Sequence, residues 1–398
     1  MRAYSVSDEE ALRARDLLKD WAGEGYLTPA QFEQLEPETA CKLRRTNVCL
    51  RIVSFAFTLL IVAAAVGLAF VVFLDPVPAS VFLLLFAPVC YVAAELAVSQ
   101  ASLYRFGIEE ALAVSSIGLL CVGLVVGFNV FPSTPTGVNI QILAPLAGTI
   151  FSLWIWHRFG LPYAFFAAMI FTVWLTGYWT SAGTEQHLAV AAFFAVALLT
   201  VIAISPRYRR TYLQPRMAIA EALLWLGIYL AFNVEISGSN PVWLGRGSLL
   251  NSGEFPRPFY WSTWVLIWCL PPVVLARGLR QKDKPVVAVG ILVTLLTLLT
   301  SKSYLGTQSY TWDPMILGAL LIGTALVVRY WLSTGPGGIR HGFTAQRLSG
   351  RDNSLLDAGV AVSGLVSRHL PEPTTPAPGP EATFGGGNSG GAGASSDF

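Results

Sequence analysis

The sequence predicts an all-α membrane protein, a polytopic bundle of about ten transmembrane helices with both ends of the chain in the cytoplasm. Hydrophobic residues make up 54% of the chain and charged residues only 13%, far from the balance of a water-soluble domain. Apolar stretches recur between residues 52 and 332, and about 20 helical residues span the hydrocarbon core of a bilayer. Basic residues fall on alternate connections between these stretches. In lipid the backbone must satisfy its own hydrogen bonds, which makes each stretch a helix.

Residues 1–46 are polar and patterned as a cytoplasmic helical hairpin. Ser7 to Glu10 has the form of a capping box at the start of a first helix, and Gly23 and Gly25 end that helix. Thr28 to Gln31 offers an N-cap, a proline at the first helical position and a glutamine that closes a second box. The core of such a hairpin is too small to fold alone. We therefore expect it to dock on the bundle, on a second copy of the chain or on a partner.

Residues 47–333 form the predicted transmembrane bundle. The first apolar stretch begins too far along the chain for a cleavable signal peptide, and the basic residues before it hold the N-terminus inside. The predicted inner connections carry most of the basic residues, and the outer ones carry only Arg246, Arg257 and Lys302. This alternation predicts an N-in, C-in topology. The expected crossings are residues 52–74, 78–98, 108–131, 140–157, 161–180, 187–204, 217–234, 260–276, 285–301 and 313–332.

One eight-residue pattern occurs twice. R-x-x-I-x-E-A-L spans residues 105–112 and again residues 216–223, at the starts of the third and seventh predicted helices. The spacing favours an internal parallel repeat that relates helices 3–6 to helices 7–10, and transporters place their sites at such repeat interfaces. Chance similarity and duplication without transport stay open as alternatives. The candidate residues of a cytoplasmic vestibule are Glu95, Arg105, Glu110, Arg216 and Glu221.

The same acidic residues also have a purely structural interpretation. A carboxylate in the first turn of a helix is favoured by the helix dipole. Arg105 and Glu109 are four residues apart, the spacing at which helical side chains pair. Prolines 88, 145, 271 and 272 are expected to kink packed helices, and Gly123 with Gly127 forms a small-residue packing face.

No motif for chemistry is found along the chain. The five cysteines and four histidines are scattered, which predicts no metal site and no cofactor. The sequence contains no H-E-x-x-H, G-x-S-x-G or P-loop pattern. The interiors of the predicted crossings almost lack charged residues, whereas ion-coupled transporters place such residues there. The sequence therefore argues against an enzyme.

The C-terminal part changes composition. Residues 334–370 form a predicted cytoplasmic juxtamembrane segment, in which Leu355 to Leu370 has the spacing of a short amphipathic helix. Residues 371–398 are rich in proline and then glycine, and such a tail is expected to be disordered. The tail is either a flexible segment that keeps the protein soluble at the membrane surface or, through residues 384–398, a peptide that binds a partner.

Two stretches resemble known bacterial families. Leu17-Leu-Lys-Asp-Trp21 followed by Gly25-Tyr-Leu-Thr28-Pro-Ala-Gln31 resembles the G-x-[IL]-[ST]-x-x-Q hairpin of predicted bacterial multi-pass membrane proteins of unknown function. The glycine-rich ending is similar to the tails of TPM-domain proteins, although the TPM domain itself is absent. These resemblances imply a location in the bacterial inner membrane and supply no catalytic residues.

Two functions lead the hypotheses, ahead of an intramembrane enzyme. The favoured one is a non-enzymatic inner-membrane protein that scaffolds, senses or assembles through its hairpin and tail. The alternative is a permease or flippase for an uncharged or lipid-like solute. The expected partners are the lipid bilayer, a membrane protein bound through residues 1–46 or 384–398, and a second copy of the chain; no nucleic acid is expected. A cavity lined from both halves would favour transport, and solid packing with exposed hairpin contacts would favour a scaffold.

Overall fold

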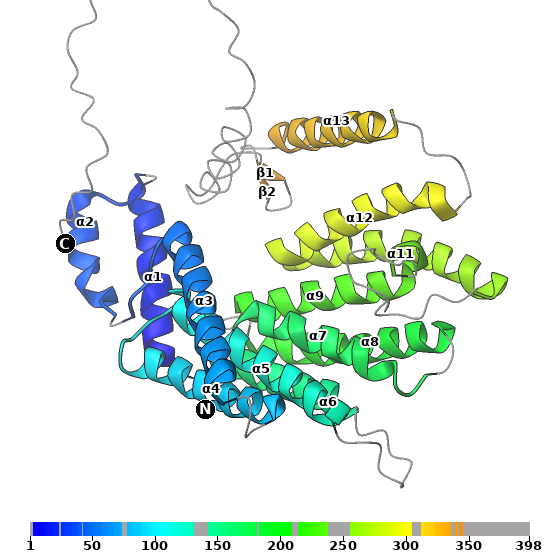
Figure 1. The fold of residues 1–398 in the computed structure, drawn as a ribbon. Helices are drawn as coiled ribbons and strands as arrows, with labels where there is room; N and C mark the ends of the chain where they lie inside the picture. The colour runs from blue at the N-terminus through cyan, green and yellow to red at the C-terminus, as the bar shows by residue number, and fades with distance from the viewer. Residues whose placement is uncertain are drawn as a thin grey trace, which may run out of the picture. The chain divides into compact units, whose positions relative to one another are not determined.

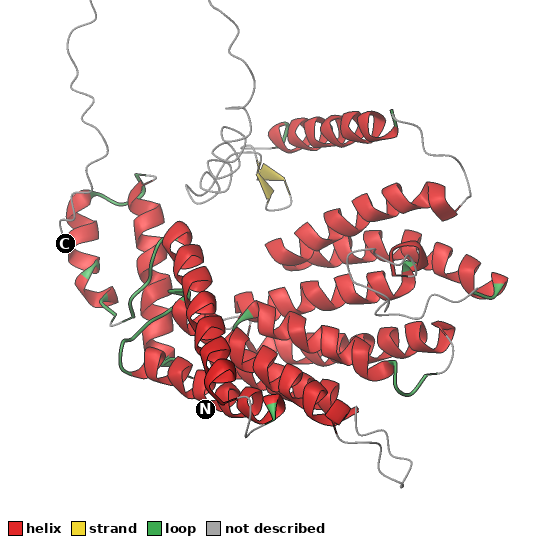
Figure 2. Cartoon of the chain, in the orientation of Figure 1, coloured by secondary structure: helices red, strands yellow, loops and turns green. Residues whose placement is uncertain are grey.

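The structure, a computed structural model, is built almost entirely of helices in its described part (Figures 1 and 2). Several predictions of the sequence fall outside the residues that it describes, namely the amphipathic helix at 355–370, the tail at 371–398 and most of the long outer loop at 235–259. The described residues are 3–23, 25–41, 43–73, 78–130, 142–180, 183–208, 214–237, 255–304, 312–335, 339–340 and 343–344.

The N-terminal hairpin consists of α1 (Val6–Gly23), α2 (Pro29–Leu35) and the 3-10 turn η1 (Pro37–Thr39). The second capping box is confirmed, because the Thr28 hydroxyl accepts from the Gln31 N–H and the Gln31 side chain accepts from the Thr28 N–H. The first box was placed wrongly. α1 is capped by Ser5, whose hydroxyl accepts from the Asp8 N–H at 3.1 Å. Ser5 also precedes an acid, Asp8, by three residues.

Ten apolar helices follow in the described part of the chain, and each coincides with a predicted crossing. A four-residue helix, α10 (Val234–Ser237), lies among them. Two-residue strands, β1 (Ile339–Arg340) and β2 (Phe343–Thr344), pair antiparallel after the last helix and are the small exception to the all-α prediction. The ten helices are α3 (Val48–Phe73), α4 (Ala79–Ser99), α5 (Ile108–Val130), α6 (Leu143–Phe159), α7 (Pro162–Thr176), α8 (Gly183–Tyr208), α9 (Gln214–Phe232), α11 (Arg257–Gln281), α12 (Lys284–Tyr304) and α13 (Asp313–Ser333).

Six of these helices, as far as the chain is described, are both long and apolar enough to cross a membrane: α3, α4, α5, α8, α11 and α12. α6 has 17 residues and α7 has 15, fewer than the roughly 20 that span a bilayer core without thinning it. The fold is thus an α-helical membrane bundle with six candidate crossings in its described part. The total number of ten crossings stays a prediction.

Helix ends gather alternately on two sides of the bundle. Ion pairs join the starts of α3 and α5, the ends of α4 and α6, and the end of α11 with the start of α9. α1 docks on this side, which we call the hairpin side. On the opposite far side, hydrogen bonds join the start of α8 to the end of α9, and the end of α12 to the start of α10. Consecutive helices from α3 to α12 therefore run up and down.

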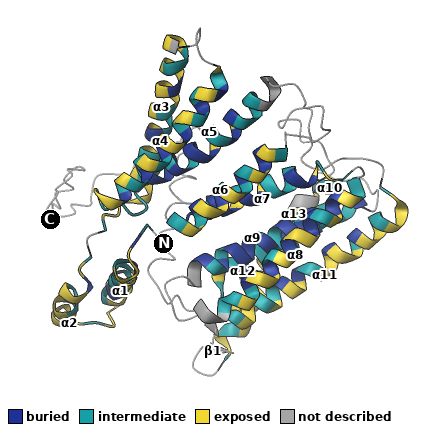
Figure 3. Cartoon of the chain, turned by 90° about the horizontal axis from the view of Figure 1, so that it is seen from below, coloured by how far each residue is buried: buried dark blue, intermediate teal, exposed yellow. Residues whose placement is uncertain are grey.

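Two helices form the centres of the packing. α5 packs against α3, α4 and α6, and α9 packs against α7, α8, α11 and α12. Only 6% of the residues in the apolar part of α3 are buried, against 44% in α5 (Figure 3). The predicted small-residue face is confirmed, because a Cβ atom on Gly123 would lie 3.0 Å from Leu84 of α4 and one on Gly127 would lie 3.3 Å from Ser80. Close backbone approach of this kind is how small residues join helices in lipid.

Candidate functional site

Four ion pairs form a layer at the hairpin side, and all but one of the predicted vestibule residues take part in it. Three of those residues are almost fully buried: the exposed fraction is 3% for Glu110, 1% for Glu221 and 8% for Arg216. We call this set the ion-pair layer; it consists of Arg51–Glu110, Arg158–Glu95, Arg216–Glu9 and Arg277–Glu221.

Glu110 is held by an arginine of α3. Arg51 donates from Nε and Nη2 to the two carboxylate oxygens at 2.8 and 2.5 Å, the two-point geometry that makes such pairs strong. Gly107 permits this approach. Its φ is +103°, and a Cβ atom there would lie 2.2 Å from the Arg51 carbonyl oxygen. The start of α5 therefore lies directly against the first turn of α3.

Glu221 is held by a different element. Its carboxylate accepts from Nε of Arg277, near the end of α11. Among the described residues, no hydrogen bond or ion pair links Glu221 with Glu110. The two acids are therefore paired separately, Glu221 with α11 and Glu110 with α3.

The two copies of the repeated pattern differ at their arginines. Arg105 lies in the connection before α5 with a φ of 52°, and its guanidinium carbon lies 5.7 Å from the centre of the Tyr104 ring. Arg216 is already helical, since α9 begins at Gln214, and its Nη2 donates to Glu9 at 2.5 Å. The left-handed Gly107 delays the helix in the first copy, whereas Ala218 continues it in the second. Only the second halves of the two patterns share a structure.

This difference makes the predicted Arg105–Glu109 pair wrong. Arg105 is outside the helix, so the spacing of four residues does not bring the side chains onto one helical face. One oxygen of Glu109 instead accepts from the Phe106 N–H at 2.8 Å. The other oxygen is buried and has no hydrogen-bond partner within the described part of the chain.

Glu95 belongs to a separate contact between α4 and α6. Arg158 donates to its two oxygens at 2.6 and 2.9 Å. The Tyr91 hydroxyl donates to the same carboxylate and accepts from the Trp154 indole N–H. This group joins the ends of two neighbouring helices.

The hairpin docks on the bundle, one of the three arrangements that its small core allowed. The Ala3 N–H donates to the Arg158 carbonyl at 3.0 Å, and the Tyr4 ring lies 4.9 Å from the Tyr104 ring in an edge-on contact. Glu9 reaches Arg216 of α9. Neither Tyr4 nor Glu9 could be predicted from the sequence, because a single tyrosine and an acid in a first helical turn have no pattern that indicates burial.

Docking through Tyr4 is expected to fail at high pH. Burial, together with the nearby Glu109, Glu110 and Glu9 carboxylates, raises the pKa of the Tyr4 hydroxyl well above 10. The folded state thus favours the neutral phenol, so its stabilisation is complete below about pH 10 and is lost as the pH rises further. The distance between spin labels at Val6→Cys and Leu96→Cys, in a background without other cysteines, should lengthen above that pH. Tyr4→Phe should keep the short distance to a higher pH; identical titrations of the two proteins would contradict this.

A second polar cluster lies on the far side, where α9 stops and α10 begins. The Tyr229 hydroxyl accepts from the Asn233 amide at 2.8 Å and from the Thr297 hydroxyl at 3.0 Å. The Val234 N–H, which lies at the break between the helices, donates to the Tyr304 hydroxyl at 2.8 Å. We call this group the far-side network. These residues are uncharged, so the charge pattern of the crossings does not predict the network.

His187 joins α8 to the same region. It is fully buried, and its Nδ1 lies 2.6 Å from the Ala231 carbonyl oxygen. A carbonyl only accepts, so Nδ1 carries the proton. Its ring meets Phe255 edge-on at 5.3 Å. This hydrogen bond joins the start of α8 to the end of α9.

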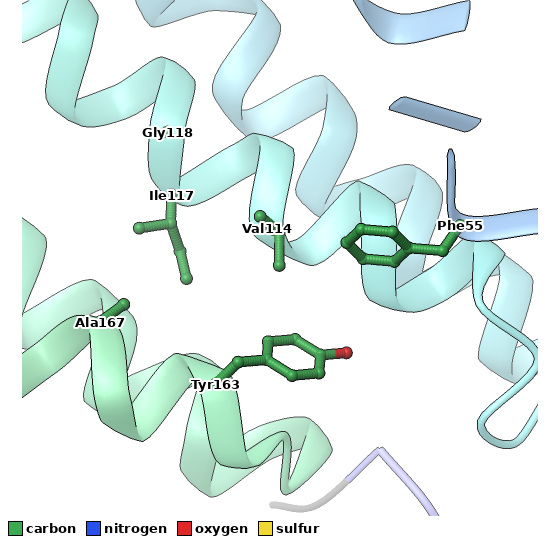
Figure 4. Close-up of a pocket in the computed structure, with 6 residues that line it drawn as sticks. All are labelled: Phe55, Val114, Ile117, Gly118, Tyr163 and Ala167. Atoms are coloured by element: carbon green, nitrogen blue, oxygen red, sulfur yellow. The ribbon is translucent and has the colours of Figure 1, made fainter. Parts of the chain in front are cut away.

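A cavity of about 440 Å³ lies between α3, α5 and α7 (Figure 4). None of its lining residues comes from α9 or any later helix, so it is not a cavity shared by the two predicted repeat halves. The lining residues are Phe55, Val114, Ile117, Gly118, Tyr163 and Ala167.

Within the described residues, no three His, Cys, Asp or Glu side chains come together as they would around a metal ion. The fold and the ion-pair layer define a helical membrane bundle with four charged pairs on the described part of its hairpin side. No family model, curated protein or solved structure matches the chain.

Proposed function

We propose that this chain is a non-enzymatic, multi-pass protein of the bacterial inner membrane that scaffolds or senses through its N-terminal hairpin. The observation that carries this proposal is the unequal burial of the hairpin. The start of α1 is fixed in the bundle by Tyr4 and Glu9, which are each 5% exposed. The other end offers apolar side chains to solvent: Leu17 is 42% exposed, Trp21 47% and Tyr26 68%. Exposed aromatic residues on a fixed element are typical of binding surfaces.

The ion-pair layer supports this function over transport through the hairpin side. A vestibule that binds a solute needs accessible polar groups, but Glu110 and Glu221 are buried against arginines. Breaking such a pair leaves a charge without compensation in a medium of low dielectric constant. These acids therefore stabilise the contacts between neighbouring helices in the bundle.

We further propose that all ten apolar helices cross the membrane and that the hairpin side faces the cytoplasm. The distribution of basic residues at the helix ends supports this orientation. On the far side the described helix ends include Arg257 and Lys302. The described helix ends on the hairpin side include Arg51, Arg158, Arg216, Arg277, Arg280 and Lys284.

The internal repeat also stays part of the proposal. α4 and α8 precede α5 and α9 and pack against them, and α6 and α11 follow and pack against them. The order of packing thus recurs after four helices. The separate partners of Glu110 and Glu221 argue that duplication here served to build the bundle.

The test is site-specific photo-crosslinking in native membranes. A photoreactive amino acid at Trp21 or Tyr26 should capture one defined protein. The same group at Lys19 should not, because Lys19 is exposed on the opposite face of α1. Trp21→Ser with Tyr26→Ser should abolish the capture while the hairpin stays docked. Equal capture from all three positions, or none from any, would contradict the proposal.

The permease hypothesis has one observation in its favour. Discontinuous helices that expose backbone groups mark substrate sites in many transporters, and α9 is interrupted at Asn233 within an uncharged polar network. If the chain is a permease, proteoliposomes that contain it should take up uncharged solutes. Asn233→Leu should abolish this uptake while the amount of folded protein stays the same. A scaffold would show no uptake with either protein.

A further inference from the structure

We infer that the cavity between α3, α5 and α7 binds one acyl chain of a membrane phospholipid, with the ester and phosphate region of the lipid at Tyr163 and Arg51. This inference is independent of the proposed function, because the cavity contains no hairpin residue. The inference depends on the apolar lining of the cavity, on the direction from its polar to its apolar end, and on the hydrogen-bond donors at the polar end.

The lining suits a hydrocarbon chain. It consists of aliphatic and aromatic side chains together with the bare backbone at Gly118, and the Tyr163 hydroxyl is its one polar side-chain group. No atom lies within 4 Å of a Cβ atom built on Gly118, so this glycine contributes open space. Apolar cavities do not hold ordered water, and an unfilled space deprives its walls of packing contacts.

The cavity has a polar end and an apolar end. The starts of α3 and α5 lie together through Arg51 and Glu110. Tyr163, in the first turn of α7, lies close enough to that pair for the charges to act on its hydroxyl. Gly118 and Ala167 lie further along their helices, so the apolar end is further from the hairpin side. An acyl chain that enters from the hairpin side has this same order of polar and apolar parts.

The polar end offers hydrogen-bond donors. The Tyr163 hydroxyl is buried near the Glu110 carboxylate but forms no hydrogen bond of normal length with any described residue, although buried hydroxyls normally have a partner. Arg51 uses Nε and Nη2 for Glu110, and its side chain is 31% exposed. The ester carbonyl of a phospholipid can accept from Tyr163, and a phosphate can accept from the remaining amino group of Arg51.

The surroundings identify the source of the chain. The cavity is not enclosed, and two of its three helices, α3 and α5, are candidate membrane crossings. Only 6% of the residues in the apolar part of α3 are buried, which leaves the bilayer as its neighbour. A phospholipid of that bilayer supplies both the hydrocarbon chain and the phosphate for Arg51.

The experiment uses the full chain in phosphatidylethanolamine vesicles that contain a minor fraction of phosphatidylcholine with a photoactivatable acyl chain. After irradiation, mass spectrometry should find adducts on peptides from residues 108–130 and 162–176. Gly118→Leu should reduce these adducts to the level of the other lipid-facing helices. The matched control is Gly67→Leu in α3, where a side chain also meets no atom within 4 Å, and it should label like the wild type.

Two further variants keep the test decisive. Ala167→Leu fills the cavity from α7 and replaces Gly118→Leu if that protein fails to elute as folded. Tyr163→Phe removes one hydrogen bond and should lower labelling about fivefold. Labelling that survives both fillers would overturn the inference. So would labelling of the cavity by a photoactivatable free fatty acid but not by the phospholipid.

Discussion

Arg51→Ala is expected to lower the free energy of unfolding by about 3 kcal/mol, whereas Glu110→Gln should lower it by only about 1 kcal/mol. The asymmetry follows from burial. The Glu110 side chain is 3% exposed and that of Arg51 is 31% exposed. Loss of the arginine leaves a charged group away from water, while loss of the carboxylate charge leaves an arginine that water can reach. Reversible unfolding in mixed micelles measures both values.

Two more proteins complete this experiment. Arg51→Ala combined with Glu110→Gln should recover most of the loss, because no buried charge then remains. Arg45→Ala is the matched control, since the side chains of Arg45 and Asp16 are 38% and 28% exposed, and the loss of such a surface pair should change stability by less than about 1 kcal/mol. Equal losses of stability for Arg51→Ala and Glu110→Gln would contradict the argument that the burial of Glu110 makes the two variants differ.

The positions of the helices could be predicted because they depend on local properties of the chain. A continuous apolar stretch forms its hydrogen bonds within itself, so its extent in the sequence is close to its extent in space. The capping box at Thr28 is equally local and was predicted fully. The cap of α1 was not, since Ser5 and Ser7 both fit the pattern and the burial of Tyr4 favours the earlier one.

The ion-pair layer could not be predicted in this way. Glu110 pairs with Arg51, which lies 59 residues earlier in the sequence, and Arg216 pairs with Glu9, which lies 207 residues earlier. Several arginines at helix ends were equally available from the sequence, and only the packing of the helices selects one. The repeated pattern was informative about helix starts but misleading about side chains. A single glycine, Gly107, changes where the helix begins.

The far-side network escaped prediction for a different reason. Tyrosine, asparagine and threonine are tolerated in a membrane helix when a neighbouring helix satisfies them. Here the partners of Asn233 come from α9 itself and from α12, so the need for them becomes visible only once the helices are packed. A search for charged residues in the crossings does not detect such groups. Asn233 near the end of an apolar stretch was the available signal.

Gly160→Ala is expected to release the hairpin from the bundle. Gly160 connects α6 to α7 with a φ of +71°, and a Cβ atom there would lie 2.0 Å from the guanidinium carbon of Arg216. Alanine in this left-handed conformation costs about 1–2 kcal/mol. The arginine side chain can move away, but it then leaves Glu9, and a buried pair broken in this way costs about 3 kcal/mol. Undocking solvates Glu9 and avoids that cost, so the docking equilibrium should shift by about two orders of magnitude.

Gly25→Ala is the matched control for this clash. Gly25 has nearly the same backbone conformation, a φ of +78°, but no atom lies within 4 Å of a Cβ atom there. It should therefore show the backbone strain without the loss of docking. The distance between spin labels at Val6→Cys and Leu96→Cys should lengthen in Gly160→Ala and stay short in Gly25→Ala. A short distance in both would mean that Arg216 does not hold the hairpin, and Tyr4 and the Ala3 N–H would then be the contacts that keep α1 in place.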